Sequence, residues 1–132
     1  MLYLVNRQRA SLHRIFMQTD AVKLKASIEY LGCDGEHFRA FIARKMVPGM
    51  TWDNIHLDHI KPVAAFNLQD HGQFLDCCHY SNFQPLLAAD NLEKHDKWSA
   101  EAEAFWREHI RGREHAEIYN PFASPGQAPD KV

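Results

Sequence analysis

The chain has 132 residues, of which 45% are hydrophobic and 24% charged, and its formal net charge is −2. This composition is typical of a globular protein with one domain, and it excludes a disordered or collagen-like chain. It also excludes a strongly basic nucleic-acid-binding protein, although residues 1–50 hold eight Lys or Arg against four Asp or Glu.

The first part of the chain, residues 1–50, predicts a helical arm. Apolar positions at helical spacing fill residues 4–17, and a polar pair at residues 19–20 can cap a second helix. Asp34 can cap a third helix over about residues 35–46. The buried face of that helix is expected to hold Phe38, Phe41 and Ile42.

The middle of the chain, residues 51–98, predicts two strands and a closing helix. Residues 55–60 and 83–87 have the composition of strands, and a helix is expected from about residue 88. The connection between the strands is too long for a simple hairpin loop. We therefore expect it to contain a short helix over about residues 70–80.

The last part of the chain predicts a C-terminal helix within residues 99–119, because residues 100–110 are rich in helix formers. This helix can be separate or an extension of the closing helix. Residues 120–132 contain four Pro or Gly and predict a flexible tail. The expected fold class is α+β: a hairpin of two antiparallel strands plus a helix, flanked by N-terminal helices and a C-terminal helix.

Three polar motifs follow one another in this middle region: HLDHIKP at residues 56–62, HYSNFQPLL at residues 79–87 and ADNLEKHDK at residues 89–97. Their succession resembles the phage- and virus-type members of the HNH family of endonucleases. The likeness covers roughly residues 28–98. It implies a ββα-metal core over residues 51–98, wrapped around one metal ion, and an enzyme that hydrolyses DNA phosphodiester bonds.

The resemblance also implies a role for each polar residue of the centre. Neighbouring strand residues face opposite sides, so Asp58 can bind the metal while His59 faces the scissile phosphate as general base. Asn91 matches the family's ligand on the helix, and Asn82 matches the Asn that pins the loop beneath His59 and completes the catalytic set. Two plainer interpretations stay open: residues 90–91 as a helix cap and Asn82 as a turn residue.

Oxygen ligands favour Mg²⁺ or Mn²⁺ as the cofactor. His95, four residues beyond the helix ligand and on the same helical face, is a candidate third ligand that would shift the preference toward Mn²⁺, Ni²⁺ or Zn²⁺. A solvated His or a phosphate contact is the open alternative. Lys94 and Lys97 are candidates for binding substrate phosphates, or they form a solvated helix face. His56 shares a strand face with Asp58 and can support that carboxylate or the substrate.

DNA is the expected partner, and a non-catalytic nucleic-acid-binding or assembly module is the alternative function. An inhibitor protein, as for toxin-like nucleases, and a homodimer are further options that no residue indicates. Three Cys without a Cys-x-x-Cys pair and the lack of a long apolar window predict a protein of a reducing cytoplasm, bacterial or host-cell, with no membrane partner.

Overall fold

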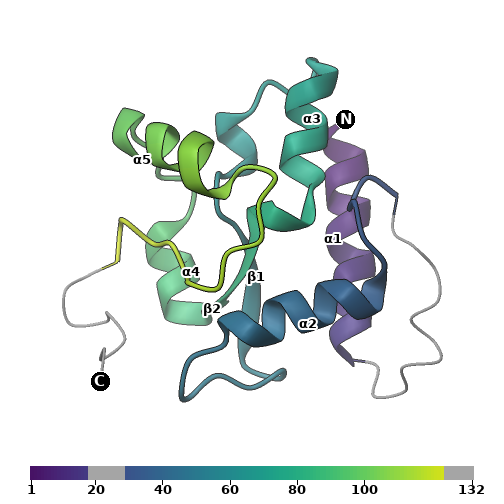
Figure 1. Cartoon of the computed structure of the whole chain (residues 1–132), viewed down its shortest axis with the longest axis vertical. Coiled ribbons are helices and arrows are strands. Elements are labelled where there is room, and N and C mark those ends of the chain that lie inside the picture. The colour runs from purple at the N-terminus through teal and green to yellow at the C-terminus, as the bar shows by residue number, and fades with distance from the viewer. Residues whose placement is uncertain (18–28, 124–132) are drawn as a thin grey trace.

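The computed structural model describes residues 1–17 and 29–123, which form an α+β arrangement of five helices and one two-stranded antiparallel sheet (Figure 1). The second helix expected after residue 19 and most of the tail expected over residues 120–132 lie outside the described residues. No helix of the described part is long and apolar enough to cross a membrane. The elements are α1 (Leu2–Met17), α2 (Gly35–Lys45), β1 (Ile55–His59), α3 (His71–Cys78), β2 (Phe83–Leu87), α4 (Ala88–Lys94) and α5 (Ala100–Phe105), which continues as a π-helix over Trp106–Ile110.

The pairing of the two strands determines which polar residues lie opposite each other. Strands β1 and β2 pair antiparallel, with Ile55 opposite Leu87 and Asp58 opposite Gln84. Pro85 is tolerated within β2 because each strand of a two-stranded sheet has one edge free of pairing. Helix α3 lies between the two strands, and α4 begins at the residue after β2, where a helix was expected.

Side-chain caps mark where α2 and α3 begin. The carboxylate of Asp34 accepts a hydrogen bond from the backbone N–H of His37 at 2.8 Å and starts α2. Asp70 accepts one from the N–H of Gln73 at 3.2 Å and starts α3 inside the long connection. Both predicted helices are therefore confirmed at their starting points.

Two apolar clusters join segments that are distant in sequence. The first contains Leu12 of α1 and packs α2 against the sheet. The second contains Val5 of α1 and packs α3 against the C-terminal helix. Because α1 contributes a fully buried residue to each cluster, it belongs to the body of the protein, and the expected arm, core and C-terminal helix share their apolar interior. The two clusters are Leu12, Leu31, Phe38, Phe41, Ile42 and Phe83, and Val5, Ile60, Phe66, Phe74, Cys77, Cys78, Trp106 and Ile110.

The C-terminal helix lies within residues 99–119 as expected, covers the run of helix formers from Ala100 and ends at Ile110. Gly112 adopts a φ of +68°, a conformation that glycine reaches more readily than other residues and that commonly ends helices. The chain then returns beside the sheet, where the N–H of Tyr119 donates to Oε1 of Gln84 at 2.8 Å. The segment after Gly112 is thus held by a partner on the sheet.

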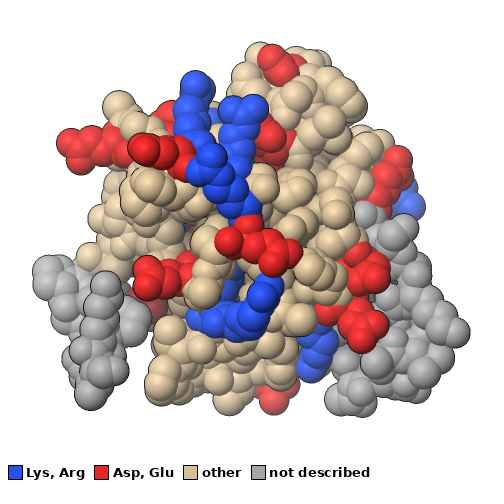
Figure 2. All heavy atoms as spheres, viewed as in Figure 1, with Lys and Arg blue, Asp and Glu red and all other residues tan. Residues whose placement is uncertain are grey.

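Charged side chains of both signs are interleaved on the face drawn in Figure 2. Three of the protein's arginines are paired with carboxylates: Arg44 with Glu114, Arg107 with Glu103 and Arg111 with Asp76. The basic side chains in view, including the group above the centre of Figure 2, thus lie beside acidic ones, which weakens their attraction for a phosphate backbone.

Candidate functional site

A cleft of about 1200 Å³ lies between α1, β1 and α4. Five of the residues singled out in the sequence line it, namely His56, Asp58, His59, Asn91 and His95. Helix α1 adds polar groups that the sequence did not connect to them, and the strongly exposed Leu92 also lines the cleft. Three other candidates, Asn82, Lys94 and Lys97, do not line this cleft.

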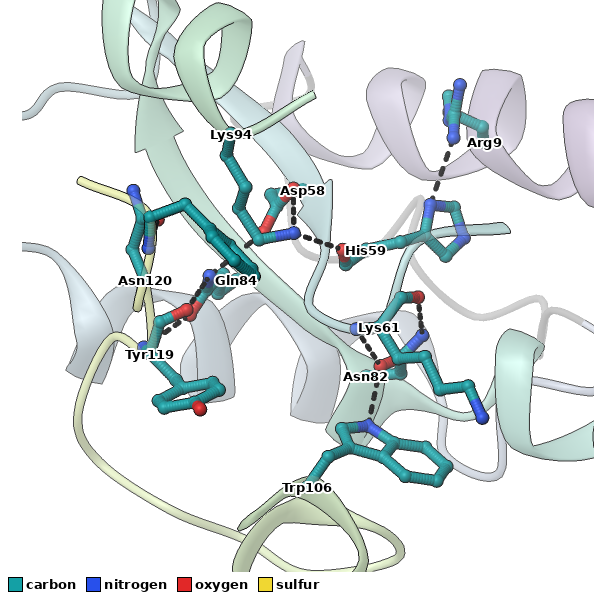
Figure 3. Close-up of polar contacts among 11 residues, drawn as sticks. Arg9, Asp58, His59, Lys61, Asn82, Gln84, Lys94, Trp106, Tyr119 and Asn120 are labelled. Atoms are coloured by element: carbon teal, nitrogen blue, oxygen red, sulfur yellow. Dashed lines mark hydrogen bonds and ion pairs between the residues drawn. The ribbon is translucent and has the colours of Figure 1, made fainter. Parts of the chain in front are cut away.

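Asp58 lies on the inner side of the cleft, with 4% of its surface exposed. Its Oδ2 accepts a hydrogen bond from Nε2 of Gln84 at 2.9 Å, and its Oδ1 lies 3.2 Å from Nζ of Lys94 (Figure 3). Burial raises the pKa of Asp58, whereas Lys94, Gln84 and Arg9 act to lower it. The carboxylate is thus held in one orientation by two donors, and each oxygen keeps a lone pair.

Lys94 is fully buried, and this placement differs from the expectation that it contacts substrate phosphates. Its ammonium bridges Asp58 and the backbone carbonyl of His59, which it reaches at 3.0 Å. Burial lowers the pKa of Lys94, and the neighbouring carboxylate counters that effect. Lys94 therefore neutralises the centre from inside. Lys97 is exposed beyond the end of α4, where its N–H closes a turn onto the carbonyl of Lys94.

His59 points to the opposite side of β1, toward α1 (Figure 3). Nη2 of Arg9 lies 2.9 Å from its Nδ1, and its ring packs on Phe83 at a centroid distance of 4.5 Å. Its Nε2 is buried and has no hydrogen-bond partner. Burial, then the charges of Arg9 and Lys94, lower the pKa of His59 to about 3, so the imidazole is neutral at pH 7.

Asn82 is fully buried and holds the chain two residues beyond His59. Its Oδ1 accepts from the N–H of Lys61 and from the indole N–H of Trp106, each at 2.9 Å. Its Nδ2 donates to the carbonyl of Lys61 at 3.1 Å. All of these contacts are within the protein, so Asn82 acts on the centre through the backbone that follows His59 rather than on a ligand.

Asn91 lies in the first turns of α4, is half-buried and lines the cleft. His95 was expected on the same helical face as Asn91. The structure does not place it there, because α4 ends at Lys94. His95 instead adopts a φ of +43° and a ψ of −124°, and its side chain is 77% exposed with Nε2 at 3.9 Å from Asp96. It therefore reaches the cleft from a strained turn, while the exposed His56 reaches it from β1.

The donors of the cleft suit a hard divalent ion better than a soft one. Within residues 1–17 and 29–123, no three His, Cys, Asp or Glu side chains come together as a metal-binding group. Asp58, which carries a carboxylate, and Asn91, which carries an amide, instead line the same cleft. Mg²⁺ commonly keeps several waters and uses only one or two carboxylates from the protein, so this small donor set fits it.

Two residues of the site were missed in the sequence, Gln84 and Arg9. Gln84 could have been found, because pairing residues 55–59 with 83–87 in register sets it opposite Asp58. Arg9 lies 50 residues before His59 and belongs to a different element, so no local pattern connects the two.

No family model and no solved structure matches this chain. Over 77 residues it is 34% identical to uncharacterized protein L426 of Acanthamoeba polyphaga mimivirus. This alignment covers 55% of this chain and 34% of that protein. Over 89 residues it is 32% identical to uncharacterized protein L246 of the same virus, covering 64% of this chain and 39% of that protein. The chain thus spans less than half the length of these curated relatives. The likeness is distant, it is to viral proteins whose names state no activity, and it assigns no family.

Proposed function

We propose that this chain is a metal-dependent endonuclease of the HNH type that hydrolyses DNA phosphodiester bonds. The observation that carries the proposal is that Asp58, His59 and Asn91 line one cleft although they come from a strand and from the helix after its partner strand. Strand, strand and helix in this order support a ββα-metal centre. Two residues with hard oxygen ligands and a neutral imidazole at one cleft support metal-assisted hydrolysis.

Asp58 and Asn91 would hold one divalent ion, Mg²⁺ or Mn²⁺, with His95 as a further candidate donor on the cleft wall. Bound there, the ion would offset the negative charge that develops on the phosphate. Gln84 and Lys94 fix the Asp58 carboxylate, and their contacts hold it ready without a change of rotamer. The remaining chemistry falls to the protein's own residues.

His59 is the general base of the proposed reaction. It takes a proton from a water molecule, whose oxygen attacks phosphorus while the bond from phosphorus to the 3′ oxygen breaks. The leaving oxygen takes a proton from solvent, which gives a 5′-phosphate and a 3′-hydroxyl. Asn82 keeps the chain after His59 in place through its two bonds to Lys61. A 3′-phosphate product would contradict this mechanism.

The test is the nicking of supercoiled plasmid in Mg²⁺, Mn²⁺, Ni²⁺, Zn²⁺ or EDTA. We compare wild type with His59→Ala and Asn91→Ala, and with His71→Ala as a control at an exposed histidine outside the cleft. Metal-dependent nicking that both cleft variants lose and the control keeps is the expected result. Equal nicking by wild type and His59→Ala would remove His59 from the reaction.

A non-catalytic nucleic-acid-binding module is the second candidate, and one observation favours it. In the described structure Asp58 is paired with Lys94, and Nδ1 of His59 is occupied by Arg9. Both groups needed for hydrolysis therefore already have partners in the protein. Salt-sensitive DNA binding that His59→Ala leaves unchanged, together with no cleavage in any metal, would support this candidate.

A further inference from the structure

The contact between Arg9 and His59 determines which nitrogen of the imidazole is available. A guanidinium has only donors, so at 2.9 Å its Nη2 donates and Nδ1 of His59 accepts. The proton of the neutral ring then resides on Nε2, which is buried without a partner. With Nδ1 occupied and Nε2 protonated, neither nitrogen can accept a proton until Arg9 moves.

Arg9 itself is exposed and lines the cleft. It forms no ion pair with a carboxylate among the described residues, so its partner in the cleft is a neutral ring. A phosphate oxygen is a stronger partner for a guanidinium than a neutral imidazole, because both members of that pair are charged and the geometry can be bidentate. A phosphodiester that enters the cleft therefore competes with His59 for Arg9.

Helix α1 does not depend on Arg9 for its attachment. Val5 and Leu12 are fully buried in the two apolar clusters, and Nε2 of Gln8 donates to the carbonyl of Cys78 at 2.7 Å. The guanidinium can thus leave His59 while the helix stays in place. The contact of Arg9 with His59 is therefore not needed to attach α1.

We propose that Arg9 is a substrate-responsive residue that covers Nδ1 of His59 in the free protein and transfers to a phosphate oxygen of the bound nucleic acid. The transfer frees the lone pair of Nδ1 for the water proton and adds a positive charge beside the phosphate. This inference rests on the proposed function for the role of His59, whereas the phosphate contact of Arg9 is testable without cleavage.

The first measurement is binding of a short fluorescent DNA duplex in EDTA over a range of salt concentrations. Arg9→Gln should reduce the slope of log K against log salt by about 0.9 and weaken binding roughly tenfold at about 0.1 M salt, as expected for one lost phosphate contact. Arg9→Lys, which keeps the charge, should keep the slope. Arg7→Gln is the control on the same helix, because Arg7 is exposed and does not line the cleft.

The second measurement is the nitrogen-15 resonance of His59 Nδ1, assigned with His59→Gln, at constant pH. The duplex should shift this resonance in wild type as Arg9 leaves, and in Arg9→Gln the resonance should already have the released position. Equal slopes for Arg9→Gln and Arg7→Gln, with an Nδ1 resonance that the duplex does not shift, overturn the proposal even if the plasmid is nicked. If Arg9→Gln reduces the salt slope but the wild-type protein never nicks plasmid, the proposed nuclease function is wrong and Arg9 remains a phosphate ligand.

Discussion

The ammonium of Lys94 lies 3.2 Å from Oδ1 of Asp58, and both side chains are buried. Neither charge can be solvated by bulk water there, so each depends on the other and on a few polar neighbours. This relationship gives Lys94 a role inside the protein rather than at its surface. Loss of either side chain would leave the other charge buried and unpaired.

Lys94→Met should destabilise the protein by about 3 kcal/mol, because it leaves the buried carboxylate of Asp58 without its cation. Chemical denaturation in the absence of divalent metal measures the loss. Lys97→Met is the matched control, since that lysine is exposed, and a change within about 0.5 kcal/mol is expected. The double variant Asp58→Asn, Lys94→Met should lose less than the sum of the single changes. Strict additivity would show that the pair does not interact.

Gln84→Ala should cost about 2 kcal/mol and loosen the C-terminal segment. The change leaves Oδ2 of Asp58 and both backbone groups of Tyr119 without the partner that the fully buried Gln84 provides. Limited proteolysis within residues 113–123 should therefore become faster than in wild type. Gln69→Ala, at an exposed position, should change neither the stability nor the cleavage pattern. Unchanged proteolysis of Gln84→Ala would mean that other contacts hold this segment.

Local signals were sufficient for most of the fold. Asp34 caps the predicted helix that follows it, a short helix begins after Asp70 as expected, and strand β2 has the predicted bounds Phe83–Leu87. Such features depend on interactions within a few residues, which a sequence displays directly. The run of helix formers at residues 100–110 is helical as expected, whereas the course of the segment after it depends on tertiary partners such as Gln84, which no local signal displays.

Only those residues of the candidate site that lie in the sequence motifs could be predicted. Residues 56–59 and 91 were singled out because they stand in recognisable runs, and they do share a cleft. The burial of Lys94 was not predictable, because alternating charges in a short helix usually indicate a solvated face. Arg9 was equally hidden, since its contact with His59 depends on how α1 packs against the sheet.

His95→Gly should raise the stability of the protein by about 1 kcal/mol. The φ of +43° and ψ of −124° at His95, in a turn closed by the N–H of Lys97 on the carbonyl of Lys94, suit glycine and strain other residues. His95→Ala is the control, because it removes the imidazole and keeps the strain, and it should not be stabilised. The midpoints of urea unfolding measure both. If His95 binds the metal, both variants should lose metal affinity equally, whereas a loss confined to one would be a backbone effect.

Glu103 should stabilise the protein at neutral pH and lose this effect in acid. Burial alone would raise its pKa, but hydrogen bonds from Lys61, Trp98 and Arg107 together lower that pKa to about 2. Because the pKa in the folded state is below the usual value of 4.5, the stabilisation is fully present above about pH 4.5 and is lost as the pH falls toward 2. Its size is roughly 2 kcal/mol, since the side chain is partly exposed.

Glu103→Gln tests this assignment. The variant should be less stable than wild type at pH 7 by roughly that amount, and the difference should shrink as the pH falls through the window from about 4.5 to 2. Glu101→Gln removes the same charge at an exposed position of α5 and should follow the wild-type curve. Denaturation midpoints at several pH values measure all three proteins. Parallel curves for Glu103→Gln and wild type would show that the ion pair with Lys61, at 2.8 Å between Nζ and Oε1, contributes nothing to the acid sensitivity.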